Sequence, residues 1–127
     1  AAALCGRARS HGKGAACAVF PTPQLASQLV RQDWSRFPLD LALPMDYFSF
    51  YREPASWVND MAAAAVQQTQ GRFPIAPGLH LPDYDVQSLP KALQELRALR
   101  VPGISLFSSE EFSPALRKAL QDWKHGK

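Results

Sequence analysis

One pattern occurs four times along the chain: a short apolar run, a loop, and a stretch whose apolar residues have helical spacing. The apolar runs predict strands near residues 15–20, 39–45, 74–80 and 103–107. Each cycle takes about 25 to 33 residues, which is the size of one βα unit. The chain is therefore expected to alternate strands with helices.

Local start and stop signals support the expected helices. Thr22-Pro23 and Ser113-Pro114 each place a capping hydroxyl before a proline at the first helical position. A third helix is expected to open at Pro54 and to stop at Gly71. The three tryptophans lie at apolar helical spacing and are expected in the core: Trp34, Trp57 and Trp123.

Strands that alternate with helices predict an α/β fold with a parallel sheet and right-handed crossovers. The strand candidates are continuous apolar runs, which is typical of parallel strands. Four βα units can form either a small open sheet or half of an eight-stranded barrel. Polar and aromatic residues follow every predicted strand, at the end where a TIM barrel carries its site. No G-x-G-x-x-G motif follows a strand, so the dinucleotide-binding form of the open sheet has no support. The sequence therefore favours four consecutive βα units with parallel strands, half of a (βα)8 TIM barrel.

Composition excludes several classes of protein. The chain has 127 residues, 46% of them hydrophobic, which suits one domain with a real core. Its net charge of +3, with the surplus mainly at the two ends, is a mild bias and not the basic stripe with interleaved aromatics of a nucleic-acid-binding surface. No apolar stretch approaches the roughly 18 residues of a membrane span. The two cysteines, Cys5 and Cys17, lack zinc-ligand or redox spacing and are expected to be free thiols.

A longer stretch of sequence also resembles a known family. GKGAACAVFPTPQLASQLVRQDWSRFPLDLALPMDYFSFY is similar to the later strands of bacterial glycoside-hydrolase-like TIM barrels, the family-10-like proteins, in which a strand ending in P-M-x-Y recurs. GLHLPDYD at 78 and GISLFS at 103 fit the seventh and eighth strands of that pattern. The resemblance, from Gly12 to Trp123, implies that residues 1–127 are a single partial domain, βα units five to eight, with residues 1–13 ending a preceding helix.

The same resemblance implies action on the glycosidic bonds of poly- or oligosaccharides, and export from the cell. Four earlier units that supply one catalytic carboxylate in many such barrels would then be missing, so the chain alone is expected to be incomplete as an enzyme. The alternative is a non-catalytic half-barrel fragment or carbohydrate-binding piece that needs a partner half. Its open sheet edges predict self-association or pairing with a missing N-terminal half.

Glycosidic cleavage usually requires two carboxyl groups, and five follow predicted strands: Asp46, Asp83, Asp85, Glu110 and Glu111. We expect Asp46 to be catalytic, because burial beside Met45 would raise its pKa while Tyr47 could offer a hydrogen bond. The alternative is a structural carboxylate that pairs with an Arg or caps a loop. Asp85 is expected to be a helix N-cap, and the two glutamates are expected in solvent.

Aromatic and polar residues near the strand ends predict a sugar site, because pyranose C–H faces pack on aromatic rings while polar groups bind the hydroxyls. The expected substrate-binding residues are Tyr47, Tyr51, His80, Asp83 and Tyr84. The alternative is that the rings only pack the loops. His80 and the following aspartates lack the spacing of a zinc site, so we expect no metal and no cofactor.

Overall fold

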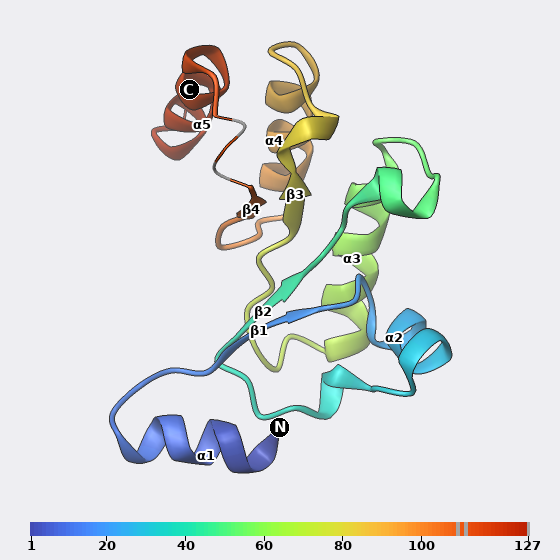
Figure 1. Cartoon of the computed structure of the whole chain (residues 1–127), viewed down its shortest axis with the longest axis vertical. Coiled ribbons are helices and arrows are strands. Elements are labelled where there is room, and N and C mark those ends of the chain that lie inside the picture. Colours follow the sequence, from blue (N-terminus) through green and yellow to red (C-terminus); the bar gives the residue numbers. More distant parts are fainter. Residues whose placement is uncertain (109, 111, 127) are drawn as a thin grey trace.

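The chain alternates strands and helices, as its sequence predicts (Figure 1). The computed structural model describes residues 1–108, 110 and 112–126. Within these residues the elements are, in order, α1 (Ala2–Ser10), β1 (Ala16–Val19), α2 (Pro23–Val30), η1 (Trp34–Arg36), β2 (Leu41–Pro44), η2 (Phe48–Tyr51), α3 (Trp57–Thr69), β3 (Gly78–His80), η3 (Leu81–Asp83), α4 (Ser88–Ala98), β4 (Ser105–Phe107) and α5 (Pro114–Lys124), where η marks a 3-10 turn.

All four predicted strand regions contain a strand, and every strand pair is parallel. β1 pairs with β2 so that Ala16 lies opposite Leu41, and β3 pairs with β4 so that Gly78 lies opposite Ser105. The strands are short, with four residues in β1 and β2 and three in β3 and β4. The positions and the parallel direction were therefore predicted correctly, but the lengths were overestimated.

The predicted half of a TIM barrel is wrong. The strands form two separate two-stranded sheets, β1-β2 and β3-β4. In the described part of the chain these sheets are linked by one isolated parallel bridge, between Ala42 and Ile75. Pro74, just before Ile75, and Pro44, two residues after Ala42, lie beside this bridge, and proline has no backbone N–H to continue a ladder. Four consecutive strands therefore do not join into one sheet.

Two helices begin at the caps that the sequence predicts. The Thr22 hydroxyl accepts a hydrogen bond from the Leu25 N–H at 3.1 Å, and the Ser113 hydroxyl accepts one from the Leu116 N–H at 3.2 Å. In both helices proline follows the cap, where its missing N–H costs nothing. α3 ends at Thr69, and Gly71 beyond it has a φ of 67°, a conformation that favours glycine.

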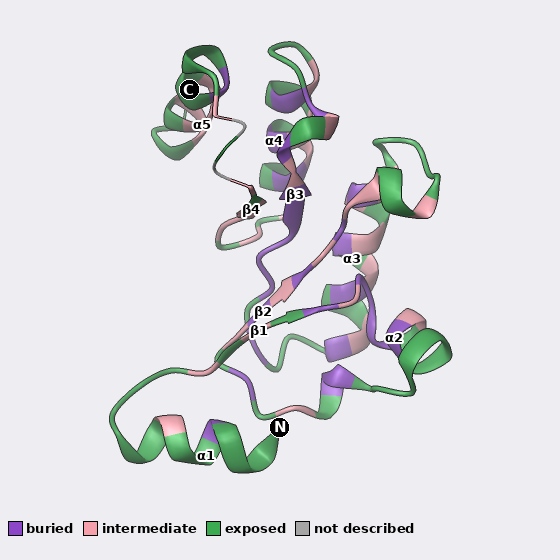
Figure 2. Ribbon diagram, viewed as in Figure 1, coloured by how far each residue is buried: buried purple, intermediate pink, exposed green. Residues whose placement is uncertain are grey.

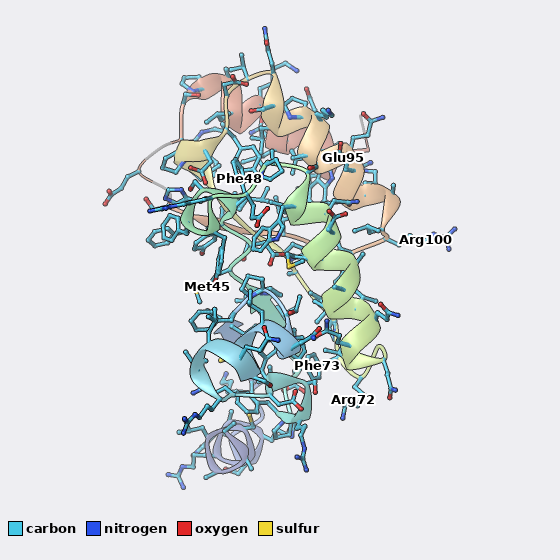
Figure 3. All side chains as sticks on the ribbon, turned by 90° about the vertical axis from the view of Figure 1, so that its right-hand side faces the viewer. Met45, Phe48, Arg72, Phe73, Glu95 and Arg100 are labelled. Atoms are coloured by element: carbon cyan, nitrogen blue, oxygen red, sulfur yellow. The ribbon has the colours of Figure 1, made fainter. Side chains whose placement is uncertain are left out.

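Two hydrophobic clusters form the core, and α3 contributes to both. Ala65 packs in the first cluster, around β1 and β2, whereas Val58 and Ala62 pack in the second, with β3, α4 and α5. Figure 2 shows buried residues along α3, α4 and the segment that leads into β3. Phe48 and Phe73, in the upper and lower halves of Figure 3, pack against the second and the first cluster respectively. α3 thus holds the two sheets together.

The tryptophans differ in burial although all three were expected in the core. Trp34 is 1% exposed, but it lies in η1 and not on a helix. Trp123 is half-buried against the second cluster and donates a hydrogen bond to the Leu93 carbonyl at 2.9 Å. Trp57, at the start of α3, is half-buried and belongs to neither cluster. The expectation was therefore wrong for Trp57.

Candidate functional site

Four aromatic side chains gather where β2, β3 and β4 end. Tyr47 follows β2, Phe50 lies in η2, His80 ends β3 and Phe107 ends β4. We call these four residues the aromatic platform. Ring centroids are 5.9 Å apart for Tyr47 and Phe107, 6.0 Å for His80 and Phe107, and 5.7 Å for Tyr47 and His80. The parallel strands therefore bring together rings that lie up to 60 positions apart in the sequence.

The geometry of the platform leaves ring surface open to a ligand. Phe107 stacks on Tyr47 at an interplanar angle of 19° and on His80 at 22°. Phe50 meets the His80 ring edge-on at 4.9 Å. Phe50 is 64% exposed and Phe107 is 53% exposed, whereas Tyr47 and His80 are half-buried. Exposed aromatic rings on a supported surface are a feature of ligand-binding sites.

Hydrogen-bonding side chains border the platform. The Ser49 hydroxyl donates to Asp83 Oδ2 at 2.7 Å, and His80 Nδ1 lies 3.2 Å from the same oxygen. The His80 contact has the distance of an ion pair but not the alignment of a hydrogen bond, and Nδ1 has no other partner among the described residues. Asp83 thus connects η2 with the end of β3. These groups can donate or accept hydrogen bonds beside the rings.

Asp46 lies directly after β2, but its carboxyl group is completely buried. Neither carboxyl oxygen has a hydrogen-bond partner among the residues that the structure describes. Burial raises the pKa of Asp46 well above its usual value, because the charged form loses its hydration. Tyr47 does not donate the expected hydrogen bond to the Asp46 carboxyl group. The pKa of Tyr47 is raised by burial and, to a smaller extent, by the charge of Asp46.

The other two predicted tyrosines lie apart from the platform. Tyr84 is 7% exposed and belongs to the second core cluster, where it meets Phe48 edge-on at 5.7 Å. Burial is the main cause that raises the pKa of Tyr84. Tyr51 contacts Trp57 instead, with ring centroids 4.9 Å apart. The structure therefore brings together Tyr47, His80 and Asp83 from the predicted set.

The remaining strand-end carboxylates have other positions. Asp85 Oδ1 accepts hydrogen bonds from the N–H groups of Gln87 at 2.9 Å and Ser88 at 2.7 Å, while the Ser88 hydroxyl accepts one from the Asp85 N–H. Asp85 was expected to be a helix N-cap; it caps the turn that leads into α4, whose own N-cap residue is Gln87. Backbone hydrogen bonds lower the pKa of Asp85. Glu110 is exposed, and Glu111 lies outside the described residues.

Phe50 and Phe107 are the platform residues outside the expected substrate-binding set, and Phe107 is the one that sequence reasoning missed altogether. It was treated as part of an apolar strand, yet its side chain is more than half exposed and stacks on two platform rings. Its position at the last residue of β4 is the same signal that drew attention to His80 at the end of β3. The sequence analysis considered mainly polar residues and tyrosines at the ends of the predicted strands. Considering every aromatic residue at those ends would have included Phe107.

No group of three or more His, Cys, Asp or Glu side chains that could hold a metal ion occurs among the described residues. Within the same residues, no helix has the length and apolar character needed to cross a membrane. No protein-family model, curated protein or solved structure matches the chain. The resemblance to glycoside-hydrolase-like barrels therefore has no support beyond the residues quoted for it.

Proposed function

We propose that this protein binds carbohydrate at the aromatic platform. The observation that carries the proposal is the stack of Tyr47 and His80 on Phe107, with Asp83 and Ser49 bonded beside it. Aromatic rings suit the C–H face of a pyranose, and the neighbouring carboxylate, hydroxyl and imidazole suit its hydroxyl groups. A site with apolar rings and a few fixed polar groups matches the usual chemistry of small-ligand binding.

Hydrolysis of a glycosidic bond is the second candidate function, and one observation favours it. The raised pKa of Asp46 is the property of a general acid in a glycosidase. However, a general acid must come within hydrogen-bonding distance of the oxygen that it protonates. Asp46 has no exposed surface in this structure. The geometry therefore supports binding over hydrolysis.

The test is titration of the chain with neutral mono- and oligosaccharides, followed by calorimetry and by NMR shifts of the platform residues. Phe107→Ala and Phe50→Ala are the main variants, because these side chains are exposed and their loss should leave the fold intact. Each is expected to weaken binding by about two- to tenfold or more. Leu29→Ala is the matched control, since Leu29 is 55% exposed and lies on α2.

Two results would contradict this function. One is that no saccharide in the panel shifts the resonances of Tyr47, Phe50, His80 or Phe107. The other is that both phenylalanine variants bind as tightly as the parent chain. Leu29→Ala is expected to bind as tightly as the parent chain, which separates loss of a platform contact from a general effect on stability.

A further inference from the structure

A groove lies between α2 and α3, and Tyr51 of η2 is one of its lining residues. Its volume is about 430 Å³, within the usual range of small-ligand sites. Its lining includes two aromatic residues, three glutamines and one carboxylate: Tyr51, Trp57, Gln24, Gln28, Gln68 and Glu53. Tyr51 and Phe50 are consecutive in η2, so their Cα atoms are only about 3.8 Å apart. One 3-10 turn thus carries a residue of the platform and a residue of the groove.

The two rings of the groove form an aromatic surface of their own. The centroids of Tyr51 and Trp57 are 4.9 Å apart, and the ring planes differ by 33°. Both residues are half-buried, and Trp57 is excluded from both core clusters. Among the described residues, neither the Tyr51 hydroxyl nor the Trp57 indole N–H has a hydrogen-bond partner. These rings can therefore pack against a ligand while their polar ends bind it.

The glutamines bring amide groups to the same groove. Gln68 Oε1, on α3, accepts a hydrogen bond from the Gln24 N–H at 2.9 Å, which fixes the start of α2 against α3. Gln28, one turn further along α2, is exposed, and no hydrogen bond within the described chain engages its side chain. An amide both donates and accepts hydrogen bonds, as does a sugar hydroxyl. The glutamine amides of the groove can therefore exchange hydrogen bonds with the hydroxyl groups of a sugar.

Charge limits the class of ligand. Among the residues that the structure describes, Glu53 is the one charged residue that lines the groove, and no Lys or Arg does so. Asp83 is the carboxylate that borders the platform. A ligand with carboxylate groups would be repelled by both, because like charges brought close together raise the free energy of the complex. The two surfaces therefore suit uncharged sugars.

We propose that the groove is a second subsite for the same glycan, so that the ligand is an extended neutral oligosaccharide that crosses η2. This inference rests on the proposed carbohydrate binding at the platform. Short ligands occupy the platform alone, and longer ones also contact Tyr51, Trp57 and the amide of Gln28. Affinity therefore increases with chain length.

The experiment measures the affinities of neutral oligosaccharides of increasing length for the parent chain and for Gln28→Ala and Tyr51→Leu. The parent chain is expected to bind long ligands more tightly than short ones. Each variant should weaken binding of the long ligands by about two- to tenfold and leave the short ones unchanged. Gln121→Ala is the matched control, because Gln121 is an exposed glutamine on α5. Thermal unfolding of each variant checks that it is folded.

The outcomes separate the two proposals. Length-independent binding that shifts only platform residues overturns the second subsite and leaves the platform intact. Full affinity of both groove variants for long ligands also overturns it. Binding of no saccharide at all overturns the proposed function itself. Tighter binding of uronic-acid oligosaccharides than of neutral ones overturns the assignment to uncharged sugars.

Discussion

Replacing Asp46 by Asn should stabilise the protein at neutral pH. The Asp46 side chain has no exposed surface, and neither of its carboxyl oxygens has a hydrogen-bond partner among the described residues. Ionising it therefore places a charge in a buried site without a hydrogen-bond partner, which is why burial raises its pKa. Asn has almost the same shape but no charge to desolvate.

The size of the effect follows from proton linkage. In the unfolded chain the carboxyl group loses its proton near the ordinary value of 3.8, whereas in the folded chain it keeps the proton to a higher pH. Between these two pKa values the folded state binds more protons, so the free energy of unfolding falls as pH rises. The slope approaches about 1.4 kcal/mol per pH unit for one proton. Below both pKa values the penalty disappears, and above both it is constant.

Urea unfolding of both proteins between pH 4 and pH 8 measures this difference. The advantage of Asp46→Asn should grow from within about 1 kcal/mol at pH 4 by up to about 1.4 kcal/mol per pH unit, until the pH passes the raised pKa. Asp40→Asn is a control of opposite sign. Hydrogen bonds from the Ala15 N–H and Arg9 lower the pKa of Asp40, so its contribution is present above the unfolded pKa and is lost as pH falls.

Parallel pH profiles for the parent chain and Asp46→Asn would refute the reasoning. They would mean that Asp46 has the same pKa in the folded and the unfolded chain. An Asn variant that is less stable at pH 7 would refute it as well, because the carboxylate would then be stabilised by partners. The same measurement bears on hydrolysis, since an ionised and paired Asp46 could not serve as a general acid at neutral pH.

Three further predictions concern stability. Gly78→Ala should destabilise the chain by about 1 to 3 kcal/mol in urea unfolding, because an added Cβ would lie 2.6 Å from the Pro44 carbonyl oxygen. Gly103→Ala should be neutral, because nothing lies within 4 Å of a Cβ added there. Equal destabilisation by the two substitutions would contradict the close packing at Gly78. Ser113→Ala should cost about 1 kcal/mol through loss of the α5 cap, and an unchanged urea midpoint would show that the cap contributes nothing. Asp85→Ala should lower the thermal midpoint, whereas Asp85→Asn should retain it. The difference in midpoint between Asp85→Ala and the parent chain should shrink as pH falls, because the lowered pKa of Asp85 makes its ionised form the stabilising one. A difference that does not change with pH would contradict this.

Local chemistry determined where the elements lie. Apolar runs bounded by proline and glycine predict strands without reference to the rest of the chain, and all four were found. The caps at Thr22, Asp85 and Ser113 were also predicted, because a cap acts on N–H groups only two or three residues away. Parallel direction followed from the helices between the strands.

Only the tertiary structure decided how the strands join and which side chains meet. Whether Pro44 and Pro74 interrupt a sheet depends on which neighbour each N–H would have faced, and that neighbour is distant in the sequence. The orientation of strand-end residues is set in the same way: Asp46 is fully buried, whereas Phe107 is half exposed on the platform. Burial depends on contacts between segments far apart in the chain, and a local pattern contains no information on them.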